Sequence, residues 1–123
     1  MARWTEADWR KPPLSVGAIK STHSKYGNRY SFVDDIRFDS QLEARLYQVL
    51  KLRQSAGEVA FFLRQIAFPL EGGVKYRCDF FAVLSAGGVE VWDAKGMETQ
   101  ASANKRKQVF ARYGIDVRIW KGE

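Results

Sequence analysis

Two charged residues near the end of a short β-prone segment have the spacing that indicates chemistry in this 123-residue chain. Asp93 and Lys95 are two positions apart, so their side chains leave an extended strand on the same face. The carboxylate there can coordinate a hard divalent cation, and the ammonium group can contact an attacking water or a phosphate. The simpler interpretation is an ordinary salt bridge between strand neighbours.

Two further acidic residues extend this set. In the predicted strand over 76–84, alternation places Asp79 on one face and the even-numbered residues from Tyr76 to Leu84 on the other. Both faces are mostly apolar, and a carboxylate in such a central strand is costly unless a charge or a metal compensates it. Glu43 precedes Leu46, Tyr47 and Leu50 by three, four and seven positions, which places it on the apolar face of a predicted helix. Glu43 is also the third residue of a capping box, an alternative that leaves it structural. The sequence thus predicts that three carboxylates and one lysine converge.

The elements that must position these residues follow from periodicity and turn residues. Strands are predicted over 29–33, 36–38, 59–68, 76–84, 89–94 and 115–120. One helix is predicted over about 41–55, and a second follows the polar stretch 97–100 and ends at about 113. This order predicts an α/β fold with a central sheet flanked by helices and preceded by a hairpin. Residues 1–24 are predicted to form an extended N-terminal arm, and residues 25–123 the folded domain.

Composition narrows the function classes. A chain with 46% hydrophobic residues and 14% aromatic residues can fill one core. One cysteine and one histidine exclude a disulfide framework, a Cys/His zinc site and two-histidine nuclease mechanisms. Because no stretch resembles a signal peptide or a spanning helix, the sequence predicts a soluble, cytoplasmic protein that does not bind a membrane.

Charge is distributed unevenly along the chain, which carries a net charge of +6. Residues 1–30 hold six basic and two acidic groups, residues 31–94 seven and nine, and residues 95–123 seven and three. Basic ends around an acidic centre suit a polyanion that is bound at the edges, with a divalent metal at the centre. A solvated basic surface is the alternative.

Two groups of residues are candidates for binding nucleic acid. Lys105, Gln108 and Arg112 align along the second predicted helix, where they could follow a phosphate backbone. Basic and aromatic residues interleave near the N-terminus at Lys25, Tyr26 and Arg29, which suits phosphate contact and base stacking. An ordinary exposed helix face and a merely flexible arm are the respective alternatives.

Glu43, Asp79 and Asp93-Ala94-Lys95 resemble the signature of the PD-(D/E)XK nuclease superfamily, in which a helix glutamate, a strand aspartate and a D/E-x-K strand surround magnesium. More narrowly, SKYGNRYSFVDDIRFDSQLEARLYQVLKLRQSAGEV, YRCDFFAV, VEVWDAKG and YGIDVRIW resemble a family of small phage and prophage proteins catalogued as a domain of unknown function, DUF1064, and placed in that superfamily. The resemblance covers residues 24–120. One departure is Cys78, which stands where the superfamily often has proline.

The resemblance implies a restriction-endonuclease-like core, a mixed four-stranded sheet with helices in the order αβββαβ. It implies that Asp79, Asp93 and the carbonyl oxygen of Ala94 ligate Mg²⁺, for which Mn²⁺ can substitute. Glu43 would hold a second metal or a metal-bound water, and Lys95 would orient or help deprotonate the nucleophile. Some related nucleases also place a glutamine on the strand after the helix, where Gln65 stands here; a buried glutamine that satisfies an edge backbone group is the alternative.

These features together predict a Mg²⁺-dependent endodeoxyribonuclease of a phage or prophage, acting in the cytoplasm of a bacterial host and leaving 5′-phosphate ends. Branched DNA is the expected substrate, as for a Holliday-junction resolvase, because a compact chain suits recognition of DNA structure better than readout of bases. Paired cuts would require a homodimer. The alternatives are a noncatalytic DNA-binding or packaging accessory protein and an RNA nuclease.

Overall fold

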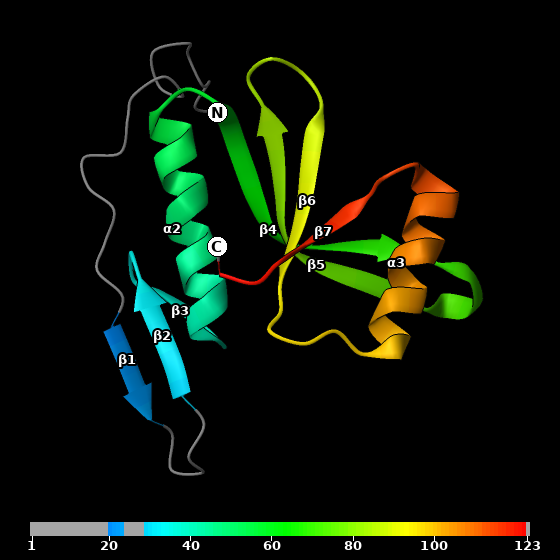
Figure 1. The fold of residues 1–123 in the computed structure, drawn as a ribbon, viewed down its shortest axis with the longest axis horizontal. Helices are drawn as coiled ribbons and strands as arrows, with labels where there is room; N and C mark the ends of the chain where they lie inside the picture. The colour runs from blue at the N-terminus through cyan, green and yellow to red at the C-terminus, as the bar shows by residue number, and fades with distance from the viewer. Residues whose placement is uncertain (1–19, 24–28, 123) are drawn as a thin grey trace, which may run out of the picture.

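The computed structural model describes residues 20–23 and 29–122, which form two sheets and two α-helices (Figure 1). The elements are β1 (Lys20–His23), β2 (Arg29–Val33), β3 (Ile36–Phe38), α2 (Gln41–Ser55), β4 (Val59–Pro69), the 3-10 turn η1 (Glu71–Gly73), β5 (Lys75–Leu84), β6 (Val89–Ala94), α3 (Gln100–Tyr113) and β7 (Val117–Trp120). From α2 onward, the order of helix, three strands, helix and strand confirms the predicted α/β class.

The larger sheet has the strand order β4-β5-β6-β7 and is mixed, because β6 and β7 run parallel while the other neighbours are antiparallel. The smaller sheet is antiparallel, in the order β1-β2-β3. Asp34 and Asp35 form its predicted turn, and their φ values of 52° and 63° match the left-handed backbone of a two-residue hairpin turn. The sequence did not predict β1, which falls within the segment assigned to the arm; residues 1–19 lie outside the described structure.

Helix α2 begins where the capping residue predicted it. The Ser40 side chain accepts a hydrogen bond from the backbone N–H of Glu43 at 3.0 Å, which satisfies one of the free donors of the first turn. Its buried stripe includes Leu46, Tyr47 and Leu50, which pack with Phe80 of β5 in the first hydrophobic cluster. Glu43 lies on the same stripe and is buried, as predicted.

Helix α3 builds the second cluster. Thr99 caps it by accepting from the backbone N–H of Ser102 at 3.1 Å, and Gly114 ends it with a left-handed φ of 70°. Val109 packs there against Val91 of β6 and Val117 of β7. Neither α2 nor α3 is long and apolar enough to cross a membrane, and no other α-helix occurs among the described residues.

The β4–β5 hairpin bends sharply in the middle, and this corrects one prediction. The sequence placed the even-numbered residues of β5 on one face, but Phe80 packs in the first cluster whereas Tyr76 and Cys78 pack in the second. Figure 1 shows the hairpin changing direction from beside α2 toward α3. The bend lies at Asp79 and at Gln65, which opposes it in β4 and has a left-handed φ of 57°. Simple strand alternation therefore fails there.

Candidate active site

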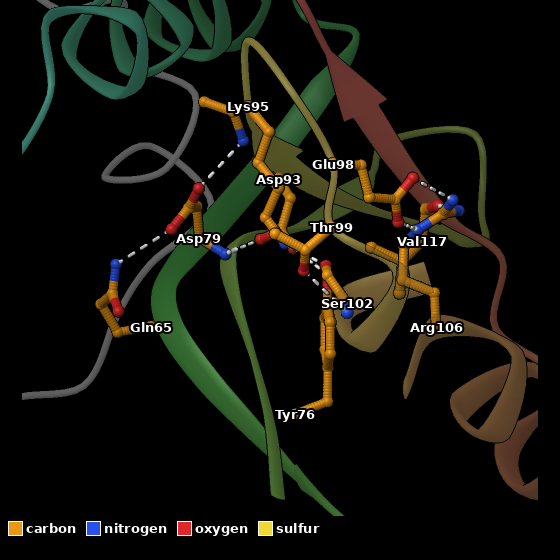
Figure 2. Close-up of polar contacts among 11 residues, drawn as sticks. Gln65, Tyr76, Asp79, Asp93, Lys95, Glu98, Thr99, Ser102, Arg106 and Val117 are labelled. Carbon is orange, nitrogen blue, oxygen red and sulfur yellow. Dashed lines mark hydrogen bonds and ion pairs between the residues drawn. The ribbon is translucent and has the colours of Figure 1, made fainter. Parts of the chain in front are cut away.

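The two aspartates of the predicted set lie where β5 and β6 separate. Regular pairing of these strands ends at Phe80 and Trp92. One step further, the backbone N–H of Asp79 donates to Asp93 Oδ1 at 2.8 Å, and the backbone N–H of Ala94 donates to Asp79 Oδ2 at 2.9 Å (Figure 2). Each carboxylate thus satisfies a backbone donor of the opposite strand. The side chains of Asp79 and Asp93 therefore close the end of the β5–β6 ladder, and we call this pair of carboxylates the fork.

Asp93 is the most enclosed of the acids, with 2% of its surface exposed. The hydroxyl of Tyr76 donates to its Oδ2, and Lys95 Nζ lies 3.4 Å from the same oxygen. Burial raises the pKa of Asp93, while the Asp79 N–H and the Lys95 ammonium act in the opposite direction. The anionic form of Asp93 is therefore held by three specific partners in a poorly hydrated position.

Lys95 connects the fork to α3. Its ammonium group donates to the Ser102 hydroxyl in the first turn of that helix, and its backbone N–H donates to the Trp120 carbonyl oxygen at 3.1 Å. Together with the ion pair to Asp93, these contacts hold the Lys95 ammonium group at one end and its backbone at the other. The salt bridge that the sequence offered as the simpler interpretation is present in this structure.

Gln65 links the helix glutamate to the fork. Its Nε2 donates to Glu43 Oε1 at 3.0 Å and lies 3.4 Å from Asp79 Oδ1. Gln65 is an exposed residue, so it is not the buried glutamine of the alternative interpretation. A left-handed φ in a non-glycine residue is uncommon and is found often at functional sites.

Glu43 has the most perturbed titration in this group. Burial, followed by the negative charge of Asp79, raises the pKa of Glu43 to about 7, although Arg64, with Nη2 4.0 Å from Oε1, opposes the shift. Burial also raises the pKa of Asp79, against the opposing effect of the Ala94 N–H. The positive charges of Arg64 and Lys95 thus do not fully offset the cost of burying the ionised carboxylates in this site.

The oxygen atoms of this site are of the chemical type that hard cations such as Mg²⁺ prefer. Glu43, Asp79 and Asp93 supply carboxylate oxygens and Ala94 a carbonyl oxygen, and Mg²⁺ is typically held by one or two carboxylates together with water. Within residues 20–23 and 29–122, however, no three histidine, cysteine, aspartate or glutamate side chains form a group that could hold a metal ion. Asp93 in particular is turned toward Tyr76 and Lys95.

The family model described as "Protein of unknown function (DUF1064)" matches residues 23–121, which is most of the chain. The chain belongs to this family. The comparisons found no match among curated proteins or solved structures. This match confirms the resemblance to DUF1064 that the sequence motifs indicated. The description of the family assigns no activity to its members.

The α3 candidates for nucleic-acid contact line a groove whose walls do not include Asp79, Asp93 or Lys95. Lys105, Gln108 and Arg112 share one face of α3 in this DUF1064 protein and line a groove of about 840 Å³ against the β4–β5 turn, whose other walls include Leu70 and Val74. Arg29 begins β2. Lys25 and Tyr26 lie outside the described residues.

Three residues that contact the set were not predicted from the sequence: Arg64, Tyr76 and Ser102. Tyr76 was assigned to the face opposite Asp79, since the bend in β5 has no simple signature in the sequence. Ser102 was not considered, although its position in the first turn after Thr99 is readable from the cap. Arg64 stacks over the Phe38 ring at 4.5 Å beside Glu43; its signal was a basic residue in an otherwise apolar run.

Proposed function

We propose that this protein is a magnesium-dependent endodeoxyribonuclease of the PD-(D/E)XK superfamily. The observation that carries the proposal is the continuous chain of contacts from Glu43 through Gln65 to Asp79 and from there to Asp93 and Lys95. It assembles the residue types that phosphodiester hydrolysis requires from α2, β4, β5 and β6. The αβββαβ order agrees with a restriction-endonuclease-like core.

Asp79 and Asp93, together with the Ala94 carbonyl oxygen, would hold the metal, and Glu43 would bind a second ion or its water. Bound Mg²⁺ supplies Lewis-acid charge that activates water and neutralises the phosphate. Lys95 would orient or help deprotonate the attacking water from its position beside Asp93. Ser102 holds the lysine ammonium, so it acts as a positioning residue.

The energetic support comes from two buried acids, Glu43 and Asp93, and the half-buried Asp79, all of which have raised pKa values. Grouping anionic side chains where water is scarce costs folding free energy, and a structural role could be filled at lower cost by neutral residues. A cation bound among the carboxylates would remove much of that penalty. Perturbed acids gathered in one place are typical of functional sites.

The proposed substrate is branched DNA, cut by a homodimer with the specificity of a junction resolvase. We further propose that the enzyme belongs to a phage or prophage and acts in the bacterial cytoplasm. One observation favours a second candidate, a noncatalytic DNA-binding or packaging protein. Asp79 and Asp93 already satisfy backbone amides and Tyr76, which a purely structural pair would also do.

The test is cleavage of end-labelled four-way junction, flap, linear duplex and single-stranded DNA, with matched RNA, each in Mg²⁺, Mn²⁺ or chelator. We expect metal-dependent cuts with 5′-phosphate ends, strongest on branched DNA. Retained DNA binding without any cleavage would favour the accessory protein. Cleavage of RNA alone would replace the substrate class with the remaining alternative.

A further inference from the structure

We propose that Met97 is an apolar wedge that enters the base stack of DNA beside the phosphate to be cut. The inference rests on the proposed function and specifies how that site would select its substrate. Met97 is 87% exposed, the largest exposure among the large hydrophobic residues whose exposure the structure describes. An isolated exposed apolar side chain needs no explanation by itself, so the proposal depends on where Met97 lies and how it is held.

Met97 stands two residues after Lys95, in the loop between β6 and α3. Figure 1 shows this loop extending below the crossing of β4–β7, at the end of the molecule where α3 begins. At the neighbouring Gly96, an added Cβ would meet no atom within 4 Å apart from its chain neighbours, so there is open space beside the backbone at that position. A DNA strand whose phosphate reaches Lys95 would therefore bring its adjoining bases near Met97.

The loop is braced on the other side of Met97. Arg106 of α3 donates through Nη2 to Glu98 Oε2 at 2.7 Å and through Nε to the other carboxylate oxygen, as in a two-pronged Arg–carboxylate pair (Figure 2). The same guanidinium donates through Nη1 to the Val117 carbonyl oxygen at 3.0 Å, which anchors the loop to β7. Lys95 fixes the preceding end through its backbone bond to Trp120.

Bracing at both ends matters because an inserting side chain loses binding free energy when its loop must first be ordered. Proteins that kink DNA use methionine among other apolar wedges, which separate neighbouring base pairs. Unstacking is cheapest where the stack is already interrupted. A wedge at this position would therefore favour branch points, bulges and mismatches over continuous duplex, without reading any base edge.

The experiment uses a four-way junction and a linear duplex carrying 2-aminopurine at the branch or at the equivalent step. Wild type, Met97→Ala and Met97→Leu are compared in chelator, so that stacking is measured without cleavage. Leu52→Ala removes another exposed apolar side chain, 57% exposed on α2, and serves as the matched control. Branched and linear substrates are then cut in Mg²⁺ with the same proteins.

We expect wild type, Met97→Leu and Leu52→Ala to raise 2-aminopurine fluorescence at the branch, and Met97→Ala to lose that rise. The ratio of branched to linear cleavage should fall about tenfold in Met97→Ala. A 2-aminopurine signal in Met97→Ala equal to that of wild type would overturn the wedge. The same result is expected if Met97 contacts a protein partner and not DNA. A Met97-dependent signal without metal-dependent cleavage would retain the wedge and overturn the nuclease.

Discussion

At the scale of the residue, the two oxygens of Asp79 have separate neighbours, Gln65 for Oδ1 and the Ala94 N–H for Oδ2. Asparagine keeps one oxygen for the Ala94 N–H and the same volume, but it removes the charge that would hold a cation. Asp79→Asn and Asp93→Asn should each abolish cleavage in the assay above while DNA affinity stays near that of wild type. Asp35→Asn, in an exposed hairpin turn, is the matched control.

Loss of the charge should also leave the metal-free fold intact or make it more stable, because it relieves repulsion among neighbouring carboxylates. Thermal unfolding in chelator measures this. If either Asp79→Asn or Asp93→Asn cleaves at the wild-type rate, the metal ligands have been assigned to the wrong residues.

Glu43 predicts a pH dependence of stability. Its folded pKa of about 7 exceeds the unfolded value of 4.5, so the folded state binds the extra proton. Protonated Glu43 therefore stabilises the folded state fully below pH 4.5, and this contribution is lost as the pH rises through 7. Its contribution to the free energy of unfolding has an upper bound of roughly 3 kcal/mol. Urea unfolding of the metal-free protein should therefore give a smaller free energy at pH 8 than at pH 5.5, and Glu43→Gln should reduce this difference. Equal pH slopes for both proteins would contradict the shift.

Replacing Lys95 tests whether this residue acts in the reaction or in the binding of Mg²⁺. Lys95→Ala should reduce turnover by about 10²- to 10⁴-fold, the range for a positioned proton-transfer group, while Mg²⁺ binding measured by calorimetry is largely retained. Ser102→Ala, which leaves the ammonium in place but unheld by the hydroxyl, should have a smaller effect on kcat. Loss of Mg²⁺ binding with Lys95→Ala would make the lysine a structural partner of the carboxylates.

At the scale of the element, the brace of the β6–α3 loop can be tested without touching the carboxylates. Arg106→Ala removes charge-assisted hydrogen bonds to Glu98 and Val117 and should lower the free energy of unfolding by about 2 kcal/mol. Glu98→Gln should show non-additive loss with it in a double-mutant cycle, read from urea unfolding. Arg112→Ala, on the exposed side of the same helix, is the control. Additive effects of Arg106→Ala and Glu98→Gln would mean that the Arg106–Glu98 pair does not contribute to stability.

The elements were largely predictable, and the failures have physical causes. Ser40 and the apolar stripe after it predicted α2, and the buried Glu43 followed from the same periodicity. Strand β1 was missed because its four residues, KSTH, lack apolar alternation and are stabilised by pairing with β2, a non-local contact. The partnership of Tyr76 and Asp93 was missed because it depends on the bend at Gln65, which tertiary structure imposes against local preference.

At the scale of the whole molecule, the basic face of α3 offers a test of DNA contact that is independent of cleavage. If Lys105 and Arg112 contact backbone phosphates, replacing both by alanine should weaken binding to every DNA sequence alike. The slope of log K against log salt should become less steep by about 0.9 for each contact, close to two in all. Filter binding over a salt series measures both effects.

The control for that test removes the same charge from another surface. Arg45→Ala with Lys51→Ala on α2 changes the net charge equally, so it accounts for the general attraction between a basic protein and DNA. A salt slope that falls by the same amount in both double variants would mean that net charge, rather than the face of α3, determines affinity.

The bend at Gln65 has a further consequence for how the protein behaves at high concentration. β4 is an edge strand of the four-stranded sheet, eleven residues long, and carries the half-exposed side chains Phe61 and Leu63. A long, flat and apolar edge is a template for pairing with another chain and hence for aggregation. The bend divides this edge into two shorter stretches that point in different directions, and Pro69 ends the second one. We therefore expect that Gln65, which links Glu43 to Asp79, also limits edge-to-edge pairing between copies of the chain.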